Sequence, residues 1–204
     1  RFVTGSGDDT VDASATDNGV QVSTGAGADS VLGGDGGDTL DAGAGDDTVN
    51  GGLGDDSITG GDGYDELQIT DQFGDDTIIG GEGGETNGNT LAGGGLTEDV
   101  TVTFNNDGES GTVTNPGGDS AQFSEIEAVE TGSGDDTIDA SGSPVGVNVE
   151  SGAGTDTITG GTGDDTFAAG AGDDTIAAGA GADSITAGDG DDDIQLTDNF
   201  GDDT

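Results

Sequence analysis

The chain has 204 residues, of which 45 are acidic, one is basic (Arg1) and 46 are glycine, so its formal net charge at pH 7 is −44. This charge excludes nucleic acid as a direct partner, because the phosphates would be repelled. A low apolar content with a high net charge is otherwise typical of disordered chains, and we expect disorder when no counter-ion is bound.

The missing residue types narrow the function further. The sequence contains no histidine, cysteine or lysine, so the usual pairs of a nucleophile and a base cannot be assembled. A glycosidase needs only two carboxylates, but nearly every acidic pair here belongs to the repeat described next. We therefore predict that the chain is not an enzyme. The absence of a long apolar run and of a basic amphipathic stretch predicts no membrane insertion.

Fifteen copies of one nine-residue phrase, Gly-Gly-x-Gly-x-Asp-x-apolar-x, make up most of the chain, and the clearest spans residues 51–59. The fourth position is always glycine, and the sixth is aspartate in fourteen copies, with Glu85 as the exception. Glycine permits a tight turn with positive φ, and the apolar eighth residue points inward from a short strand whose neighbours point outward. Each copy therefore predicts a turn followed by one short strand.

Two nonapeptides make one coil of a flattened solenoid, because each supplies one turn and one strand. Alternate copies then stack on the same edge and bring their sixth-position acids together. In the first half this aligns Asp9, Asp29, Asp47, Asp65 and Glu85 on one edge, and Asp38, Asp56 and Asp76 on the other. In the second half it aligns Asp136, Asp156, Asp174 and Asp192 against Asp165, Asp183 and Asp203.

In chain order, the pattern predicts a repeat block over residues 1–86, a β-rich spacer over 87–130 and a second repeat block over 131–204. Within the first block, residues 13–23 replace a nonapeptide with a metal-poor segment of eleven residues, and 140–150 do the same in the second. The spacer alternates apolar and polar residues around Val100–Phe104 and again around Thr112–Thr114, which predicts a hairpin. It is either a metal-free continuation of the solenoid or a protruding contact surface.

A larger repeat has an offset of 127 residues, so that Gly5–Thr10 returns as Gly132–Thr137. The chain also begins with arginine and shows no capping ends. We interpret it as a window onto about 1.6 copies of a longer tandem array.

The stacked acids require a cation. Strands in neighbouring layers lie about 4.8 Å apart, so their carboxylates repel by roughly 3 kcal/mol at an effective dielectric constant near 20. The available donors are carboxylates and turn carbonyls, which are hard oxygen ligands, while the thiolate and imidazole donors of transition metals are absent. Calcium accepts six to eight such oxygens in flexible geometry, whereas magnesium demands an octahedron. The sequence therefore favours Ca²⁺, and the ligand spacing of an EF-hand is absent.

The phrase resembles the calcium-binding nonapeptide of RTX (repeat-in-toxin) proteins over roughly three quarters of the chain. This resemblance implies an all-β, right-handed parallel β-roll with two nonapeptides per coil, interrupted by a non-RTX insertion, and about eleven Ca²⁺ ions if each adjacent pair of stacked acids holds one. It implies as ligands the fifteen sixth-position acids named above together with turn carbonyls. The turn glycines concerned are Gly25, Gly27, Gly34, Gly36, Gly43, Gly45, Gly52, Gly54, Gly161, Gly163, Gly170, Gly172, Gly179 and Gly181.

RTX proteins similar to this one are exported unfolded by bacterial type I secretion and fold outside the cell, where calcium is plentiful. We therefore expect an extracellular or cell-surface location and two alternative functions. The chain is either a structural repeat of a giant adhesin, surface layer, matrix or filament, or the calcium-triggered folding domain of an exported toxin, protease or lipase. The 127-residue repeat favours the first. Exposed strand edges predict self-association into fibres or layers.

Overall fold

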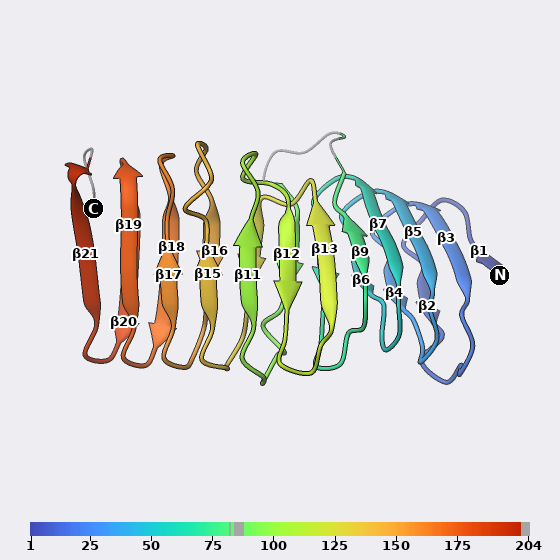
Figure 1. Ribbon diagram of the computed structural model, residues 1–204. Coiled ribbons are helices and arrows are strands. Elements are labelled where there is room, and N and C mark those ends of the chain that lie inside the picture. Colours follow the sequence, from blue (N-terminus) through green and yellow to red (C-terminus); the bar gives the residue numbers. More distant parts are fainter. Residues whose placement is uncertain (82, 84–87, 201–204) are drawn as a thin grey trace. The chain divides into compact units, whose positions relative to one another are not determined.

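Short strands alternate with glycine-rich turns throughout the computed structural model, which describes residues 1–81, 83 and 88–200, with side chains described as far as residue 196 (Figure 1). These residues include no helix long and apolar enough to cross a membrane. Contacts divide the chain into two units. Unit 1 comprises Arg1–Ala92 and Gly117–Ile126, and unit 2 comprises Gly93–Pro116 and the described residues from Glu127 onward.

In unit 1 the chain passes back and forth between two parallel sheets, so neighbouring strands of a sheet are one coil apart (Figure 1). The first sheet contains, in order, β1 (Phe2–Val3), β3 (Gln21–Ala26), β5 (Thr39–Ala44), β7 (Ser57–Asp62), β9 (Thr77–Ile79) and β13 (Ser120–Ser124). The second contains β2 (Thr10–Asp12), β4 (Ser30–Leu32), β6 (Thr48–Asn50), β8 (Glu66–Gln68) and β10 (Thr90–Ala92).

Unit 2 has the same construction. One sheet contains, in order, β12 (Gly111–Thr114), β11 (Thr101–Phe104), β15 (Thr137–Asp139), β17 (Thr157–Thr159), β19 (Thr175–Gly181) and β21 (Asp193–Phe200). The other contains β14 (Ala128–Glu130), β16 (Asn148–Glu150), β18 (Thr166–Ala171) and β20 (Ser184–Asp189). Within the two units every neighbouring pair is parallel except β11 and β12. The predicted all-β solenoid with two nonapeptides per coil is therefore confirmed.

Eighth-position side chains fill the interior of each unit. Leu40, Ile58 and Ile78 stack in register in one sheet of unit 1, and each is at most 1% exposed. The flanking residues of the same strands face outward, as in β7, where Ser57 is exposed. Val31, Val49, Leu67, Ile138, Ile158, Phe167 and Ile176 are likewise buried, each at most 2% exposed. The strand period of two thus places one apolar residue per strand in the core.

Coil length varies without disturbing the strands. Leu40 pairs with Ile58, 18 residues later, which is two nonapeptides. Ile58 pairs with Ile78, 20 residues later, because Ile69 and Thr70 are inserted between strands. Ile69 is only 3% exposed, so the additional residues are accommodated at the edge of the coil. The register of the core therefore continues through these interruptions.

The spacer strands lie within the same sheets. β11 and β12 form the predicted antiparallel hairpin, with Thr101 opposite Thr114. β11 also pairs in parallel with β15, and its inward residues Val102 and Phe104 are buried. In unit 1, β10 pairs with β8 and β13 pairs with β9. The spacer strands thus add layers to the two units.

Candidate metal sites on the turns

Glycine makes the turns between strands possible. In the turn 51–56, Gly52 has a φ of 98°, and a Cβ atom there would lie 2.2 Å from the carbonyl oxygen of Gly34 in the preceding coil. A side chain would therefore clash with backbone as well as strain the turn. Most predicted turn glycines share a positive φ, namely Gly25, Gly27, Gly43, Gly45, Gly52, Gly54, Gly170, Gly172, Gly179 and Gly181.

The sixth-position aspartates form hydrogen-bonded ladders from one coil to the next. The Oδ1 atom of Asp47 accepts a hydrogen bond from the backbone N–H of Asp29 at 2.7 Å, and Oδ1 of Asp65 accepts one from Asp47 at 2.9 Å. The same bond joins Asp9 to Asp29, Asp38 to Asp56, Asp56 to Asp76, Asp136 to Asp156, Asp156 to Asp174, Asp174 to Asp192, and Asp165 to Asp183. The stacking of these aspartates, predicted from their spacing, is confirmed.

The second carboxylate oxygen of most ladder aspartates is buried and has no hydrogen-bond partner. This holds for Oδ2 of Asp29, Asp47, Asp56, Asp65, Asp136, Asp156, Asp174 and Asp183. Each of these residues is at most 3% exposed. Burying a charged oxygen without a compensating partner costs several kcal/mol, on the order of the desolvation penalty of an ion. These buried oxygens therefore need a positive group to compensate their charge.

The pKa values of the ladder carboxyls show the same imbalance. The pKa of Asp56 is raised to about 7, chiefly by burial and to a smaller extent by the charges of Asp38 and Asp55, while the hydrogen bond from the N–H of Asp38 opposes the increase. Burial likewise raises the pKa of Asp76 to about 7 and that of Asp47 to about 6. Burial also raises the pKa of Asp65 and Asp136 to about 6, and that of Asp156 and Asp165 above its ordinary value. A bound cation would reverse this effect by favouring the charged form.

Two turns that match the phrase have a different conformation. In the turn 33–38, the N–H of Val20 donates to Oδ1 of Asp38 at 2.7 Å, and the N–H of Gly34 donates to Oδ2 at 2.8 Å. The turn 160–165 repeats these bonds with Val147, Asp165 and Gly161. Both carboxylates therefore have hydrogen-bond donors on both oxygens. No glycine of these two turns has a positive φ, and this includes the predicted turn glycines Gly34, Gly36, Gly161 and Gly163.

The neighbouring coil accounts for these exceptions. Each of the two turns packs on an eleven-residue segment, since the N–H of Asp35 donates to Thr16 O and the N–H of Thr162 donates to Ser143 O, both at 2.9 Å. A Cβ atom on Gly34 would lie 2.4 Å from the same Thr16 oxygen. The eleven-residue segments thus border turns whose carboxylates are satisfied by protein N–H groups.

Fifth-position acids form a second set of bonds that the sequence pattern did not indicate. Oδ1 of Asp46 accepts a hydrogen bond from the N–H of Tyr64 at 3.0 Å, one coil onward, on the exposed face of the turn. Equivalent bonds involve Asp8, Asp55, Asp135, Asp164 and Asp173. These acids therefore tie adjacent turns together.

The donor set fits a hard cation between layers. The chain offers carboxylate and carbonyl oxygens, and no histidine or cysteine. No group of three or more acidic side chains gathers in the described part of the chain, so an ion there would need backbone carbonyls beside the carboxylates of adjacent coils. Calcium accepts such mixed oxygen ligands in flexible numbers. The partnerless Oδ2 atoms are the groups that such an ion would neutralise.

Two predicted ligands, Glu85 and Asp203, lie outside the described residues. In the ladder that Glu85 was expected to continue, Asn89 follows Asp65, and its Oδ1 accepts the hydrogen bond from the Asp65 N–H at 2.9 Å. The sequence pattern did not single out Asn89. The only local signal was the Thr90-Leu91 pair that follows it, which matches positions seven and eight of the phrase.

Fold and turns together define a class of protein, a parallel β-solenoid with stacked carboxylates at its edges. A family model described as the RTX calcium-binding nonapeptide repeat matches residues 21–49, 32–67, 126–143, 150–185 and 169–204. These ranges cover more than half of the chain, and the chain belongs to this family of calcium-binding structural repeats. A search of curated proteins found no significant match.

Proposed function

We propose that the chain is a structural segment of a large extracellular bacterial protein, such as an adhesin, surface layer, matrix or filament, and that it folds when it binds Ca²⁺ after export. The observation that carries this proposal is the set of eight buried carboxylate oxygens without partners. Stacked carboxylates of this kind oppose folding at the low calcium concentration of a cytosol. They become favourable once millimolar calcium fills the layers.

A mechanical role is supported by the repetition itself. The offset of 127 residues copies a complete block of turns and strands, which lengthens a solenoid without adding new side-chain chemistry. The acids are distributed evenly along the edges of the coils. Repetition of this kind suits a rod or a layer, whose useful property is length.

Circular dichroism during a calcium titration tests the proposal. The chelated chain is expected to give a coil spectrum, and millimolar Ca²⁺ is expected to restore the β signal cooperatively, because each ion joins two coils. Magnesium at the same concentration is the control and should restore much less. An unchanged β spectrum in excess chelator would contradict calcium-dependent folding.

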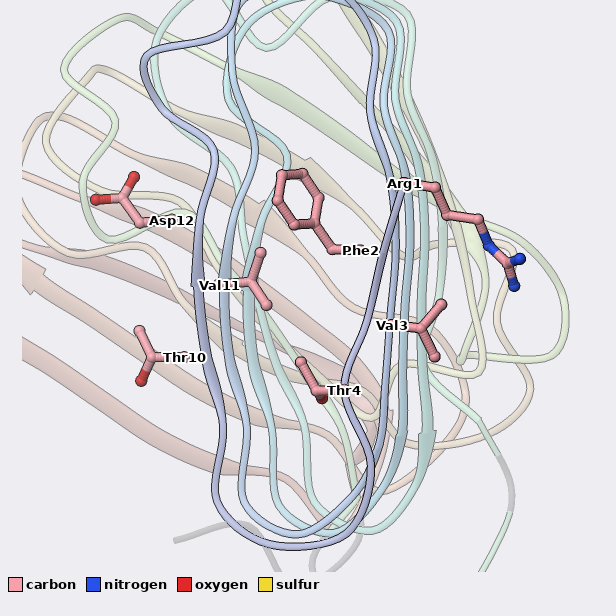
Figure 2. Close-up of a pocket in the computed structure, with 7 residues that line it drawn as sticks. All are labelled: Arg1, Phe2, Val3, Thr4, Thr10, Val11 and Asp12. Atoms are coloured by element: carbon pink, nitrogen blue, oxygen red, sulfur yellow. The ribbon is translucent and has the colours of Figure 1, made fainter.

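We further propose that copies of the chain associate end to end through β1 and β2. At this edge Phe2 is 43% and Val3 60% exposed, and a hollow of about 530 Å³ lies beside them. Figure 2 shows Phe2 and Val11 pointing into the space between the two strands, while Val3 points away. An open apolar edge of a sheet is a site for adding another strand.

Unit 2 indicates what fits this edge. β15, the 127-residue counterpart of β2, has β11 paired in parallel on its corresponding side. A parallel strand from a second copy would cover β2 in the same way. A contact in which this edge meets a different edge of the second copy continues into fibres.

Sedimentation in saturating calcium tests this contact. Val3→Asp is expected to reduce the proportion of oligomers, because it places a charge at the strand edge. Leu53→Asp is the matched control, since Leu53 is 39% exposed on a turn away from that edge. Equal sedimentation of wild type and Val3→Asp would contradict the contact.

A further inference from the structure

Asn89 occupies an aspartate position in one ladder of unit 1. It directly precedes β10, and Thr90 pairs with Glu66, so Asn89 holds the place in its coil that Asp65 holds in the coil before. Its side chain is 0% exposed. Its Oδ1 accepts from the N–H of Asp65 at 2.9 Å, which equals the bond from Asp47 to Asp65. One half of the amide thus continues the ladder.

The other half of the amide is bonded differently from the aspartates. Nδ2 of Asn89 donates to the carbonyl oxygens of Gly81 at 2.8 Å and Glu125 at 3.3 Å. In Asp47 and Asp65, the corresponding atom is a buried oxygen with no hydrogen-bond partner. The reverse orientation of the amide would set an oxygen against two carbonyls and a donor against the N–H of Asp65, so the network fixes the orientation.

The surrounding backbone is shaped to receive this amide. Glu125 has a φ of 58°, in the left-handed region that residues other than glycine seldom adopt. Its carbonyl oxygen lies against Gly80, where a Cβ atom would be 1.8 Å away. The strained residue and the close glycine together bring a carbonyl oxygen to Asn89. Carbonyl oxygens are also ligands of calcium, but here they accept hydrogen bonds from the NH₂ group of Asn89.

We propose that Asn89 replaces an aspartate together with its calcium ion, so that the run of metal layers in this ladder of unit 1 ends at Asp65. The partial positive charge of the NH₂ group neutralises the carbonyls that a cation would otherwise bind, and the amide brings no negative charge. β10 therefore docks on β8 without a metal. This inference rests on the calcium binding proposed above and identifies a layer that does without it.

Three variants of the full chain test the proposal by counting bound Ca²⁺ with native mass spectrometry in saturating calcium and by following thermal unfolding. Asn89→Asp is expected to bind one more ion than wild type, because a carboxylate facing two carbonyls requires a cation. Asn89→Ala is expected to keep the wild-type count and to unfold several degrees earlier. Asp47→Asn is the matched control inside the ladder and should lose at least one ion.

Two results would overturn the inference. One is an Asn89→Asp chain with the ion count and thermal midpoint of wild type. The other is an Asn89→Ala chain that loses an ion, which would show that the wild-type layer already holds one. If Asn89→Asp does not fold, the ion count of Asn89→Ala alone tests the inference. A wild-type chain that binds no calcium would instead refute the proposed function, so the two failures are distinguishable.

Discussion

Repeat layers and spacer layers pair their strands within the same sheets but satisfy their buried polar atoms by different means. In the repeat, Oδ2 of Asp56 is buried without a partner. In the spacer, the amide of Asn89 is hydrogen-bonded at both ends, and Val100 holds an aspartate position, contributing only a backbone N–H to Asp136. The stacking of strands is therefore independent of the metal requirement, which depends on how the polar group before each strand is hydrogen-bonded.

The same contrast appears between two turns of one edge. The turns 33–38 and 51–56 match the same phrase and lie in adjacent coils. Asp38 receives N–H donors on both carboxylate oxygens, whereas Oδ2 of Asp56 receives none. Agreement with the phrase thus does not distinguish a turn that needs a cation from one that does not.

The largest expected effect is the response of the two kinds of layer to calcium removal. As calcium is lowered stepwise, amide hydrogens within the aspartate ladders, such as those of Asp29 and Asp47, are expected to lose protection from exchange first. Amides of the hairpin strands, such as those of Val102 and Val113, should be protected to lower calcium, because their layer is held by apolar burial. Hydrogen-exchange mass spectrometry measures both sets of amides. Loss of protection at the same calcium concentration in both would contradict the difference between repeat layers and spacer layers.

The second expected effect is that the stability of the calcium-free chain depends on pH. Burial raises the pKa of Asp56 and Asp76 from the ordinary 3.8 to about 7, so between these values the folded chain binds more protons than the unfolded chain. Stability therefore falls as pH rises from about 4 to about 7. Circular dichroism in chelator should show more β structure at pH 4.5 than at pH 7.5. The opposite trend would mean that the ladders are not strained by charge.

A third prediction concerns the different metal requirements of the turns 33–38 and 51–56. Asp56→Ala is expected to remove at least one bound ion and to cost about 3–5 kcal/mol at saturating calcium, as for breaking a buried ionic contact. Asp38→Ala should cost about 1–3 kcal/mol, since it leaves buried N–H groups unpaired, and should keep the wild-type ion count. Calorimetric titration with thermal unfolding compares them, and equal loss of ions would contradict the difference.

The smallest effect concerns the fifth-position acids. Asp46→Asn keeps an oxygen that can accept from the N–H of Tyr64, so its free energy of unfolding should lie within about 0.5 kcal/mol of wild type. Asp46→Ala removes the acceptor and should cost about 0.5–1.5 kcal/mol. Chemical denaturation in saturating calcium resolves the pair. A large loss in Asp46→Asn would indicate that its charge itself binds an ion.

Periodicity alone located the strands, the inward residues and the stacked aspartates, because one turn and one strand recur at a nearly constant length. Ile58, for example, is identified as a core residue from its place in the phrase and is 1% exposed. The hairpin of Thr101–Thr114 was also foreseeable, since its apolar residues alternate with the period of a strand. The donor chemistry of the sequence likewise indicates calcium, because it offers only hard oxygen ligands.

The folded structure alone revealed which carboxylates are satisfied by protein groups. Asp38 differs from Asp56 because its partner coil is an eleven-residue segment, and the N–H of Val20 comes from 18 residues away. Asn89 meets Asp65 across 24 residues and Glu125 across 36, after the chain has passed through the spacer. Hydrogen bonds of this kind depend on the neighbouring coil, and a local phrase carries no information about that neighbour.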